Sequence, residues 1–360
     1  MTGPVADSMA AGTPAAPPRS GSIKCVVWDL DETVWEGVLL EGGAGEVRPG
    51  VRETIEELDR RGILHSVASK NEPGPVIARL EELGLAQYFL HPQVSWGPKS
   101  QAVAKIAAAL NIGIDTLAFI DDQEFERDEV RFVHPAVTCL DAKLAGSLAD
   151  LEEFIPAVVT EESGQRREMY LSAISRDEAE EEFEGPSTEF MAGLGMVFTI
   201  SPAGTEHLRR AEELTVRTHQ LNSTGRTFSL EELDQLTRSP DHLVLVAEMR
   251  DRYGSYGTIG LALVAMSGAV WKIELLLMSC RVMSRGVGTV LLHHLQARAR
   301  DAGVTLQADF VPTDRNRIMY VTYRFAGFTE IGHSDDGLIL ESASADAPVP
   351  LEHLKVVIRG

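Results

Sequence analysis

Two aspartates directly follow the first apolar segment of this 360-residue chain. The segment from Ile23 to Trp28 is largely apolar on both faces of an expected strand, and Asp29, Asp31 and Thr33 come next. A strand that is apolar on both faces suits the centre of a parallel sheet, where ligands bind at the carboxyl ends of strands. Unpaired carboxylates are costly there, so we expect a cation to meet them. An ordinary capped turn is the alternative, because Asp and Thr are common loop residues.

Polar residues stand at similar places three more times along the chain. Ser69 ends an apolar segment and precedes Lys70, Lys99 opens an expected helix, and Asp121 and Asp122 end the segment Thr-Leu-Ala-Phe-Ile. Taken singly, each has a structural explanation as a cap, a solvated helix residue or a turn. The ordered set of an acid pair, a hydroxyl, a lysine and a second acid pair is much less expected by chance. It resembles the four motifs of the haloacid dehalogenase (HAD) superfamily of aspartate-nucleophile phosphatases.

The HAD resemblance implies a role for each of these residues. Asp29 would attack phosphorus and carry the phosphoryl group, and Asp31 would protonate the leaving oxygen and then activate water. Lys99 would offset the charge on Asp29, and Mg²⁺ would neutralise the phosphoryl group through hard oxygen ligands. The expected metal-binding residues are Asp29, Asp31 (through its carbonyl) and Asp121 or Asp122. The expected substrate-binding residues of this half are Thr33, Ser69 and Lys70.

The elements that must position these residues alternate between apolar strands and amphipathic helices. This alternation predicts an α/β domain with a doubly wound parallel sheet over residues 23–154. The short spacing from Asp31 to Ser69 and from Ser69 to Lys99 leaves no room for a large cap domain. We therefore expect an open site, roofed by the segment Trp35–Pro49 or by the second half of the chain. Strands are expected at 23–28, 63–69, 88–95, 116–122 and 136–140, and a closing helix is expected to end near residue 154.

The flanking and later regions have a different pattern. Residues 1–22, rich in Ala, Pro, Gly and Ser, lack the features of a signal peptide and are expected to form a disordered tail. Residues 155–192 are strongly acidic, with six acids between Asp177 and Glu184, and are expected to form a solvated helical connector. In residues 193–332 the predicted order of strands and helices favours an α+β domain, and residues 333–360 form a C-terminal extension.

A glycine-rich turn, Ser-Arg285-Gly286-Val-Gly288-Thr, opens an expected helix of the second half. It resembles the turn that presents backbone N–H groups to a pyrophosphate in GNAT acyltransferases, and the later run Tyr-Arg-Phe-Ala-Gly-Phe resembles the end of that fold. GNAT proteins usually carry Arg or Gln where this chain has Met283. Ordinary acetyl-CoA binding therefore does not follow, and a phosphopantetheine arm is left as an open alternative. The plain reading of the turn is a helix start.

Composition limits the classes of function. The net charge of −21 argues against nucleic acid and anionic membrane surfaces as partners, and no stretch approaches the roughly 20 apolar residues of a membrane span. The three cysteines are too few and too scattered for a disulfide framework or a zinc site. These features favour a cytoplasmic protein. From Arg281 to Arg324 there are seven arginines and three aspartates, a charge that would suit an acidic partner such as an acyl carrier protein.

The two halves in this order resemble the FkbH-like proteins, the HAD-type glyceryl transferases and phosphatases of polyketide pathways. The resemblance covers roughly Lys24 to Ile331. It implies a Mg²⁺-dependent conversion of D-1,3-bisphosphoglycerate into a glyceryl thioester on a phosphopantetheinylated acyl carrier protein. Two departures are Glu32 and His219, where Asn is expected more often. The runs that carry the resemblance are Val-Val-Trp-Asp-Leu-Asp-Glu-Thr, Ser-Trp-Gly-Pro-Lys-Ser, Phe-Ile-Asp-Asp-Gln-Glu-Phe-Glu-Arg, Arg-Thr-His-Gln-Leu-Asn-Ser-Thr-Gly-Arg-Thr and Met-Ser-Cys-Arg-Val-Met.

Cys280 is the candidate acyl-carrying nucleophile that follows from this resemblance. A thiolate there would be stabilised by Arg281, Arg285 and the nearby helix start, and Cys280 is otherwise a small apolar filler at a strand end. Nothing in the sequence selects a base among His219, His293 and His294, and Cys25 and Cys139 are expected to be inert core residues. Two other functions are a small-molecule phosphomonoesterase with a non-catalytic second domain, and a non-catalytic carrier-protein adaptor.

Overall fold

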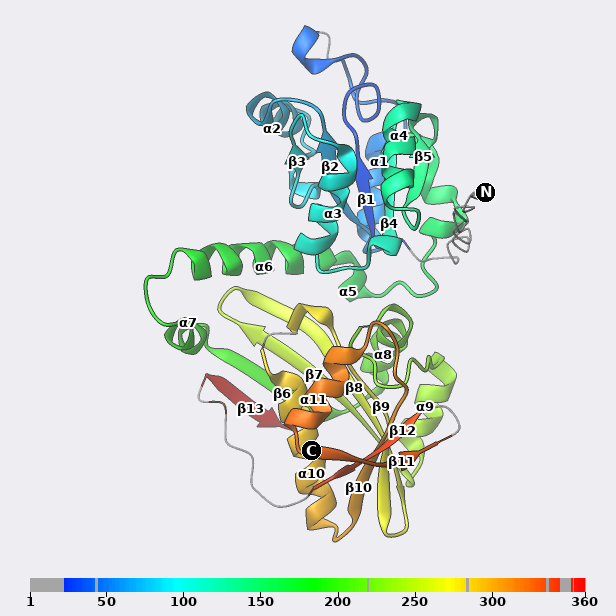
Figure 1. Ribbon diagram of the computed structural model, residues 1–360, viewed down its shortest axis with the longest axis vertical. Coiled ribbons are helices and arrows are strands. Elements are labelled where there is room, and N and C mark those ends of the chain that lie inside the picture. The colour runs from blue at the N-terminus through cyan, green and yellow to red at the C-terminus, as the bar shows by residue number, and fades with distance from the viewer. Residues whose placement is uncertain are drawn as a thin grey trace, which may run out of the picture. The chain divides into compact units, whose positions relative to one another are not determined.

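The computed structural model describes residues 23–42, 45–218, 220–282, 285–334, 337–343, 351 and 353–359. The chain divides into two compact units, Met1–Pro156 and Ala157–Gly360, and each is described by itself (Figure 1). The expected N-terminal tail, His219 and Met283 lie outside the described residues.

The first unit is built on a five-stranded sheet in which every pairing is parallel. Its strand order is β3-β2-β1-β4-β5, and all four residues of the central strand β1 are buried. The chain leaves β1 toward one edge of the sheet and then returns to the other side, so the switch in direction lies between β1 and β4. Ligands bind at such a switch point in open α/β sheets. The strands are β1 (Cys25–Trp28), β2 (Leu64–Ser69), β3 (Gln93–Val94), β4 (Leu117–Asp121) and β5 (Thr138–Asp141).

Four α-helices connect these strands, and the predicted parallel α/β architecture is confirmed. Helix α1 buries Val51, Ile55 and Leu58, which share one face at helical spacing. Between β1 and β2 the described residues form only the short η1 (Leu39–Glu41) and α1, so no large cap is inserted there. The helices are α1 (Val51–Arg60), α2 (Pro73–Glu82), α3 (Lys99–Ala109) and α4 (Glu124–Val133).

The closing helix expected to end near residue 154 is present, and it has the 3₁₀ form rather than the α form. The chain there forms two 3₁₀ segments, η4 (Ala142–Asp150) and η5 (Glu152–Phe154). The segment passes so close to the start of α1 that a Cβ at Gly146 would lie 2.4 Å from the carbonyl oxygen of Pro49. Only glycine fits at that crossing, and this close packing against another element has no signal in the local sequence.

The second unit is an α+β structure built on one eight-stranded mixed sheet, and the predicted α+β class is confirmed. The order is β11-β12-β10-β9-β8-β7-β6-β13, and among these pairs only β9 with β10 and β6 with β13 are parallel. Strands β12 and β13 come from the C-terminal extension, so the sheet is wider than expected. The strands are β6 (Met196–Pro202), β7 (His242–Asp251), β8 (Gly254–Ser267), β9 (Val270–Met278), β10 (Thr305–Phe310), β11 (Phe328–His333), β12 (Leu338–Ser342) and β13 (Leu354–Ile358).

Helices pack on both faces of this sheet. Alternate residues of β7 belong to different apolar clusters: Leu245 and Ala247 pack with α10 and α11, and Val244 and Val246 pack with α8 and α9. Because successive strand residues point to opposite faces, the two clusters lie on opposite sides of the sheet. The helices are α8 (Thr205–Arg217), α9 (Leu230–Arg238), α10 (Val287–Asp301) and α11 (Arg317–Phe325). Helix α9, which was not predicted, starts with a capping box between Ser229 and Glu232.

The acidic segment expected to be a connector is helical and belongs to the second unit. It forms α5 (Glu161–Gly164), α6 (Arg166–Glu181) and α7 (Ser187–Gly193). Phe190 of α7 joins the main apolar cluster, and the buried Arg176 of α6 pairs with Asp251 at the end of β7, with Nε 2.6 Å from Oδ2. The segment is thus tied into the second unit by buried contacts that its acidic composition did not indicate.

Strands β9 and β10 pair only along part of their length, from Val270 to Ile273 on β9. Beyond that point the segment Leu221–Thr224 lies between them. The N–H of Ser223 donates to Leu276 O and the N–H of Val311, just after β10, donates to Ser223 O, both at 2.9 Å. The chain therefore fills the divergence of its own two strands.

No helix in the described parts of the chain is both long and apolar enough to cross a membrane.

Candidate functional site

A buried ammonium joins two carboxylates at the switch point of the first unit. Lys99 Nζ lies 2.7 Å from Asp29 Oδ1 and 2.5 Å from Asp121 Oδ2, and all three side chains are almost fully buried. The carboxylates come from the ends of the adjacent strands β1 and β4, and the lysine is the first residue of α3. The structure therefore brings together three residues that the sequence predicted from separate motifs.

Burial and mutual charge govern the ionisation of this group. Burial raises the pKa of the Asp29 carboxyl, Lys99 lowers it and the Asp121 carboxylate raises it, and together these effects bring it to about 7. Burial alone would lower the pKa of Lys99, but Asp29 and Asp121 hold it above its usual value. The ammonium thus stays charged, while the Asp29 carboxyl exchanges its proton near neutral pH.

The position of Lys99 depends on helix α4. Glu129 of α4 accepts hydrogen bonds from the backbone N–H of Ser100, at 3.0 Å, and from its hydroxyl, at 2.5 Å. These contacts satisfy donors in the first turn of α3, where a carboxylate is also favoured by the helix dipole. The start of α3, and with it Lys99, is therefore fixed by a side chain from the next helix.

Three donors hold the carboxylate of Asp31. Trp35 Nε1 and the backbone N–H of Leu39 donate to Oδ1 at 2.8 and 3.1 Å, and Asn71 Nδ2 donates to Oδ2 at 3.0 Å. Trp35 and Leu39 belong to the segment expected as a roof, and Asn71 follows β2. The contribution of Asn71 was missed from the sequence, where its one signal was its place two residues after the end of a predicted strand.

An arginine holds the backbone of the acid pair at the end of β4. Arg127 of α4 donates from Nη1 to the carbonyl oxygens of Asp121 and Asp122, at 2.8 and 2.9 Å, and from Nη2 to Asp141 Oδ2, at 3.2 Å. Carboxylate oxygens of Asp29, Asp121 and Asp122 lie within 4.8 Å of one another. A set of hard oxygen ligands converging on one point fits Mg²⁺, so the residues present suit the expected metal.

The remaining predicted residues of the first unit have mixed surroundings. Thr33 is fully buried, and its hydroxyl has no hydrogen-bond partner among the described residues. Ser69 is buried at the end of β2. Lys70 forms an ion pair with the buried Glu126 of α4, a partner that the sequence did not indicate. A ligand oxygen could accept a hydrogen bond from this Thr33 hydroxyl.

Glu32, which departs from the expected Asn, has a backbone φ of 52°. Asn and Gly tolerate this left-handed region better than Glu does, which gives a physical reason for Asn at this position. The strand ends at Trp28, so Glu32 lies in a turn, where its Oε1 accepts a hydrogen bond of 3.1 Å from the N–H of Gly37. The presence of Glu rather than Asn at position 32 therefore concerns the turn after the strand and not the carboxylates beside Lys99.

In the second unit, Cys280 lies just after β9, in the short η6 (Cys280–Val282), and is partly buried. Burial raises the pKa of Tyr170, and Cys280 raises it further, which places the phenol of α6 near the thiol. Burial raises the pKa of Cys25 far above its usual range and that of Cys139 to about 11. Tyr170 was not identified as a neighbour of Cys280 from the sequence.

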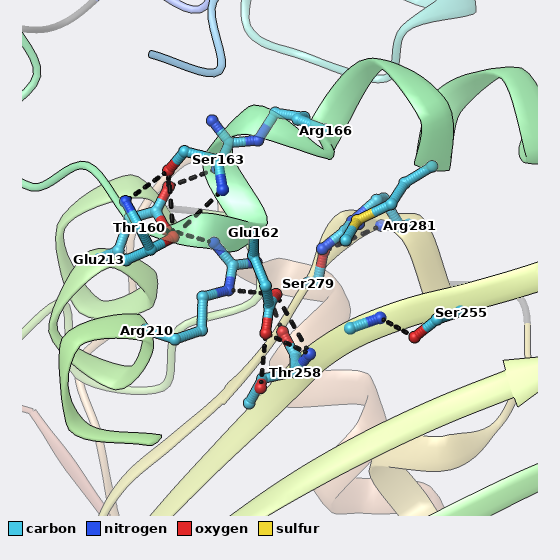
Figure 2. A network of polar contacts seen from close by, with 12 residues as sticks. Thr160, Glu162, Ser163, Arg166, Arg210, Glu213, Ser255, Thr258, Ser279 and Arg281 are labelled. Carbon is cyan, nitrogen blue, oxygen red and sulfur yellow. Dashed lines mark hydrogen bonds and ion pairs between the residues drawn. The ribbon is translucent and has the colours of Figure 1, made fainter. Parts of the chain in front are cut away.

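A network of buried polar contacts surrounds Glu213 of α8 (Figure 2). Its Oε1 accepts from Ser163 Oγ at 3.1 Å and from Arg166, and its Oε2 accepts from Thr160 Oγ1 at 2.9 Å and from Arg210 at 2.7 Å. Burial alone would raise the pKa of Glu213, but Arg166, Arg210 and Arg217 hold it well below its usual range. Both carboxylate oxygens are thus fully used.

The glycine-rich turn has a structural explanation at each described position. Gly286 caps α10 with a left-handed φ of 70°, and a Cβ at Gly288 would lie 3.1 Å from Thr322 of the neighbouring α11. Arg285 is buried, with Nη1 against the sulfur of Met191 at 2.7 Å. Backbone conformation explains Gly286, and close helix packing explains Gly288. Neither explanation requires a ligand at the turn, and neither excludes one.

Comparison with known proteins gives only partial likenesses. No family model and no curated protein sequence matches the chain. The N-terminal part of the protein BF1531 from Bacteroides fragilis, described as containing a phosphatase domain and complexed with Mg, is 28% identical over 41% of this chain, with a TM-score of 0.30. This chain covers 39% of the length of that structure.

The other similar structures include acetyltransferases. The PaiA N-acetyltransferase from Thermoplasma acidophilum, in complex with coenzyme A, is 15% identical over 40% of this chain and 98% of its own, with a TM-score of 0.31. The aminoglycoside acetyltransferase AAC(6')-Ib, also with coenzyme A, is 22% identical over 41% of this chain and 95% of its own, with a TM-score of 0.31.

Proposed function

We propose that the chain is a bifunctional enzyme that joins a Mg²⁺-dependent HAD-type phosphatase to a GNAT-like acyltransferase unit. Its substrate would be D-1,3-bisphosphoglycerate, and its product a glyceryl thioester on the phosphopantetheine thiol of an acyl carrier protein. The observation that carries the phosphatase part is the buried contact of Lys99 with both Asp29 and Asp121. The sequence resemblance to FkbH-like proteins supplies the substrate and the carrier.

In the phosphatase step, an ionised oxygen of Asp29 attacks phosphorus, and the bond to the leaving oxygen breaks as Asp31 gives that oxygen a proton. Asp31 then takes a proton from water, whose oxygen attacks the aspartyl-phosphate and releases inorganic phosphate. Lys99 offsets charge on Asp29 throughout. When magnesium is bound through Asp29, the Asp31 carbonyl and Asp121 or Asp122, it supplies further neutralisation of the phosphoryl charge.

In the acyl step, the thiolate of Cys280 attacks the carbonyl carbon of the acyl phosphate. A carbon–sulfur bond forms, the bond from that carbon to the phosphate oxygen breaks, and inorganic phosphate leaves. The pantetheine thiol of the carrier then attacks the thioester and releases Cys280. What supports Cys280 is its partial exposure beside Tyr170 and Arg281, because a nucleophilic cysteine needs access and nearby positive charge.

Helix α11 offers a surface for the carrier. It exposes Ile318, Val321 and Phe325 at helical spacing, and Arg317 and Arg324 lie on the same helix. An apolar stripe beside basic residues suits a partner with an acidic surface. This surface supports the assignment of an acyl carrier protein as the partner.

Intact-mass measurement of the carrier tests the whole proposal. The purified protein is incubated with bisphosphoglycerate, Mg²⁺ and a phosphopantetheinylated carrier, and the added mass is read. Wild type should add a glyceryl group. Asp29→Asn should add a group heavier by one phosphate, because acyl transfer continues without dephosphorylation. Cys280→Ala should leave the carrier unloaded; loading at the normal rate by that variant would exclude the cysteine intermediate.

A second candidate is a phosphomonoesterase for a small metabolite, with a non-catalytic second unit. The observation that favours it is that Leu221–Thr224 fills the gap between the diverging strands β9 and β10. Because the chain itself occupies this gap, it is not open to a ligand of the second unit. Under this alternative, Cys280→Ala would release phosphate from phosphorylated metabolites at the wild-type rate, and no carrier would be loaded by either protein.

A further inference from the structure

Arginines from three separate elements lie close together in the second unit, and one of them, Arg281, directly follows Cys280. Arg166 begins α6, Arg210 lies on α8, and Arg281 follows Cys280 after β9. Figure 2 shows Arg166 and Arg210 directed at Glu213, with Arg281 beside Ser279 in the same network view. Arg166 and Arg210 are largely buried. Guanidinium groups are seldom brought together away from water unless anions meet them.

The two carboxylates of this network are already committed. Each oxygen of Glu213 accepts two donors, as described above. Glu162 lies 2.9 Å from Arg210 Nε through Oε2, and its Oε1 accepts from the hydroxyl of Thr258 at 2.9 Å. Neither carboxylate contacts Arg281. Arg166 and Arg210 thus offset the charges of these two glutamates, so Arg281 is not needed to neutralise either of them.

Arg281 has poor acceptors for its guanidinium. Its Nε donates to Ser279 Oγ at 3.2 Å, and its Nη1 faces the thioether sulfur of Met169. No carboxylate of the described residues lies within 4.0 Å of it. A thioether is a weak hydrogen-bond acceptor, so most N–H donors of the Arg281 guanidinium are available to a stronger acceptor.

The effect of neighbouring charges supports the same reading. Burial lowers the pKa of Arg281, and Arg210 and Arg166 lower it further. Burial also lowers the pKa of Arg217, one turn beyond Glu213 on α8, with Arg166 as the next cause. Positive charges thus crowd one another here, and a bound anion would relieve this repulsion.

We propose that Arg281, together with Arg166 and Arg210, forms a binding site for a phosphate group next to Cys280. Planar guanidinium forks bind phosphate oxygens through paired charge-assisted hydrogen bonds, which makes phosphate a better match than a neutral acyl chain. The inference deepens the proposed function, on which its biological meaning rests. The phosphate group would be either the one that leaves when the thioester forms or the one that stays on the acyl group.

Phosphate binding by the full-length protein tests the site without any turnover. Inorganic phosphate and, separately, 3-phosphoglycerate are titrated calorimetrically in EDTA, so that metal-dependent binding in the first unit is suppressed. We expect Arg281→Gln to weaken binding about tenfold, as for the loss of one charge-assisted contact. Arg300→Gln, which removes the same charge from an exposed position of α10, is the matched control and should bind as wild type does.

Alkylation of Cys280 by iodoacetamide, followed by peptide mass spectrometry, locates the bound anion. Either ligand should slow alkylation of Cys280 but not of Cys139, and Arg281→Gln should remove the protection. Stronger protection by 3-phosphoglycerate assigns the site to the phosphate that stays on the acyl group, and stronger protection by inorganic phosphate assigns it to the leaving phosphate. Absence of calorimetric binding in wild type, or equal binding by Arg281→Gln and wild type, overturns the proposal. Because these tests use no acyl phosphate and no carrier, they can fail while glyceryl transfer is observed, and the reverse.

Arg281→Gln is chosen because it removes a guanidinium that does not contact Glu213, so the hydrogen bonds of Glu213 stay intact. Loss of Arg166 or Arg210 would leave a buried carboxylate without its full set of partners, which is strongly destabilising. The unfolding midpoint of Arg281→Gln in urea should therefore equal that of wild type, which separates loss of binding from loss of structure.

Discussion

Asn71 Nδ2 donates a hydrogen bond of 3.0 Å to Asp31 Oδ2 across the carboxyl ends of β2 and β1. Asn71 is buried, and its own Oδ1 accepts from the N–H of Glu72, so the side-chain amide is held at both ends. Through this contact the residue after one strand orients the proposed acid–base catalyst after the neighbouring strand.

Asn71→Ala should reduce kcat for phosphate release about 10- to 100-fold with little change in KM, as for the loss of a hydrogen bond to a charged group. The reason is that Asp31 loses one of the donors that fix its carboxylate, while the groups beside Asp29 are unchanged. Steady-state kinetics of phosphate release would measure this. Gln101→Ala, which removes an exposed amide from α3, serves as the control. An increase in KM with kcat unchanged would contradict a positioning role.

Lys99→Met should destabilise the metal-free protein by about 3–5 kcal/mol, because it leaves Asp29 and Asp121 buried without their cation. Mg²⁺ should restore part of the loss, since a divalent ion can meet the same carboxylates. Urea unfolding with and without Mg²⁺ gives both quantities. The same loss of stability with and without the ion would show that these carboxylates do not bind metal.

The affinity for Mg²⁺ should fall as the pH drops below about 7. In the metal-free protein burial raises the pKa of Asp29 to about 7, and the carboxyl must lose its proton before it can bind metal. The fraction of protein with Asp29 protonated grows as the pH falls. The apparent Kd for Mg²⁺ should therefore increase, approaching about tenfold per pH unit. Calorimetry between pH 6 and 8, in buffers of different ionisation enthalpy, would also count the proton released. A Kd that is constant over this range would show that Asp29 is already ionised.

A truncated protein ending at Pro156 should fold and bind Mg²⁺ but hydrolyse the physiological substrate poorly. The described residues of the first unit contain no inserted cap, so we predict that this unit alone does not position the substrate. We expect kcat/KM to fall on the order of a hundredfold, as when substrate positioning is lost. Phosphate release by the truncated and full-length proteins would be compared at equal Mg²⁺. Equal kcat/KM values would show that the first unit is a complete phosphatase.

Apolar periodicity was enough to predict much of the fold. Strand Cys25–Trp28 is a continuous apolar segment and Leu117–Asp121 is apolar up to its last residue, and both form where expected because burial on both faces of a sheet requires such residues. Helix α9 and strands β12 and β13 were missed, because each is short and so carries little periodic signal. The close crossing of η4 with the segment before α1 at Gly146 arises only in the packed structure, and the local sequence does not indicate it.

The sequence by itself determined the group of Asp29, Lys99 and Asp121, because each follows or opens a recognisable element at the same edge of a parallel sheet. Only the tertiary structure decided which side chains support that group, among them Asn71, Glu129 and Arg127. It also decided that arginines from polar surface-like segments surround Glu213 and lie near Cys280. The physical reason is that these contacts join residues far apart in the chain, so their energies depend on packing between elements and leave no periodic trace in the local sequence.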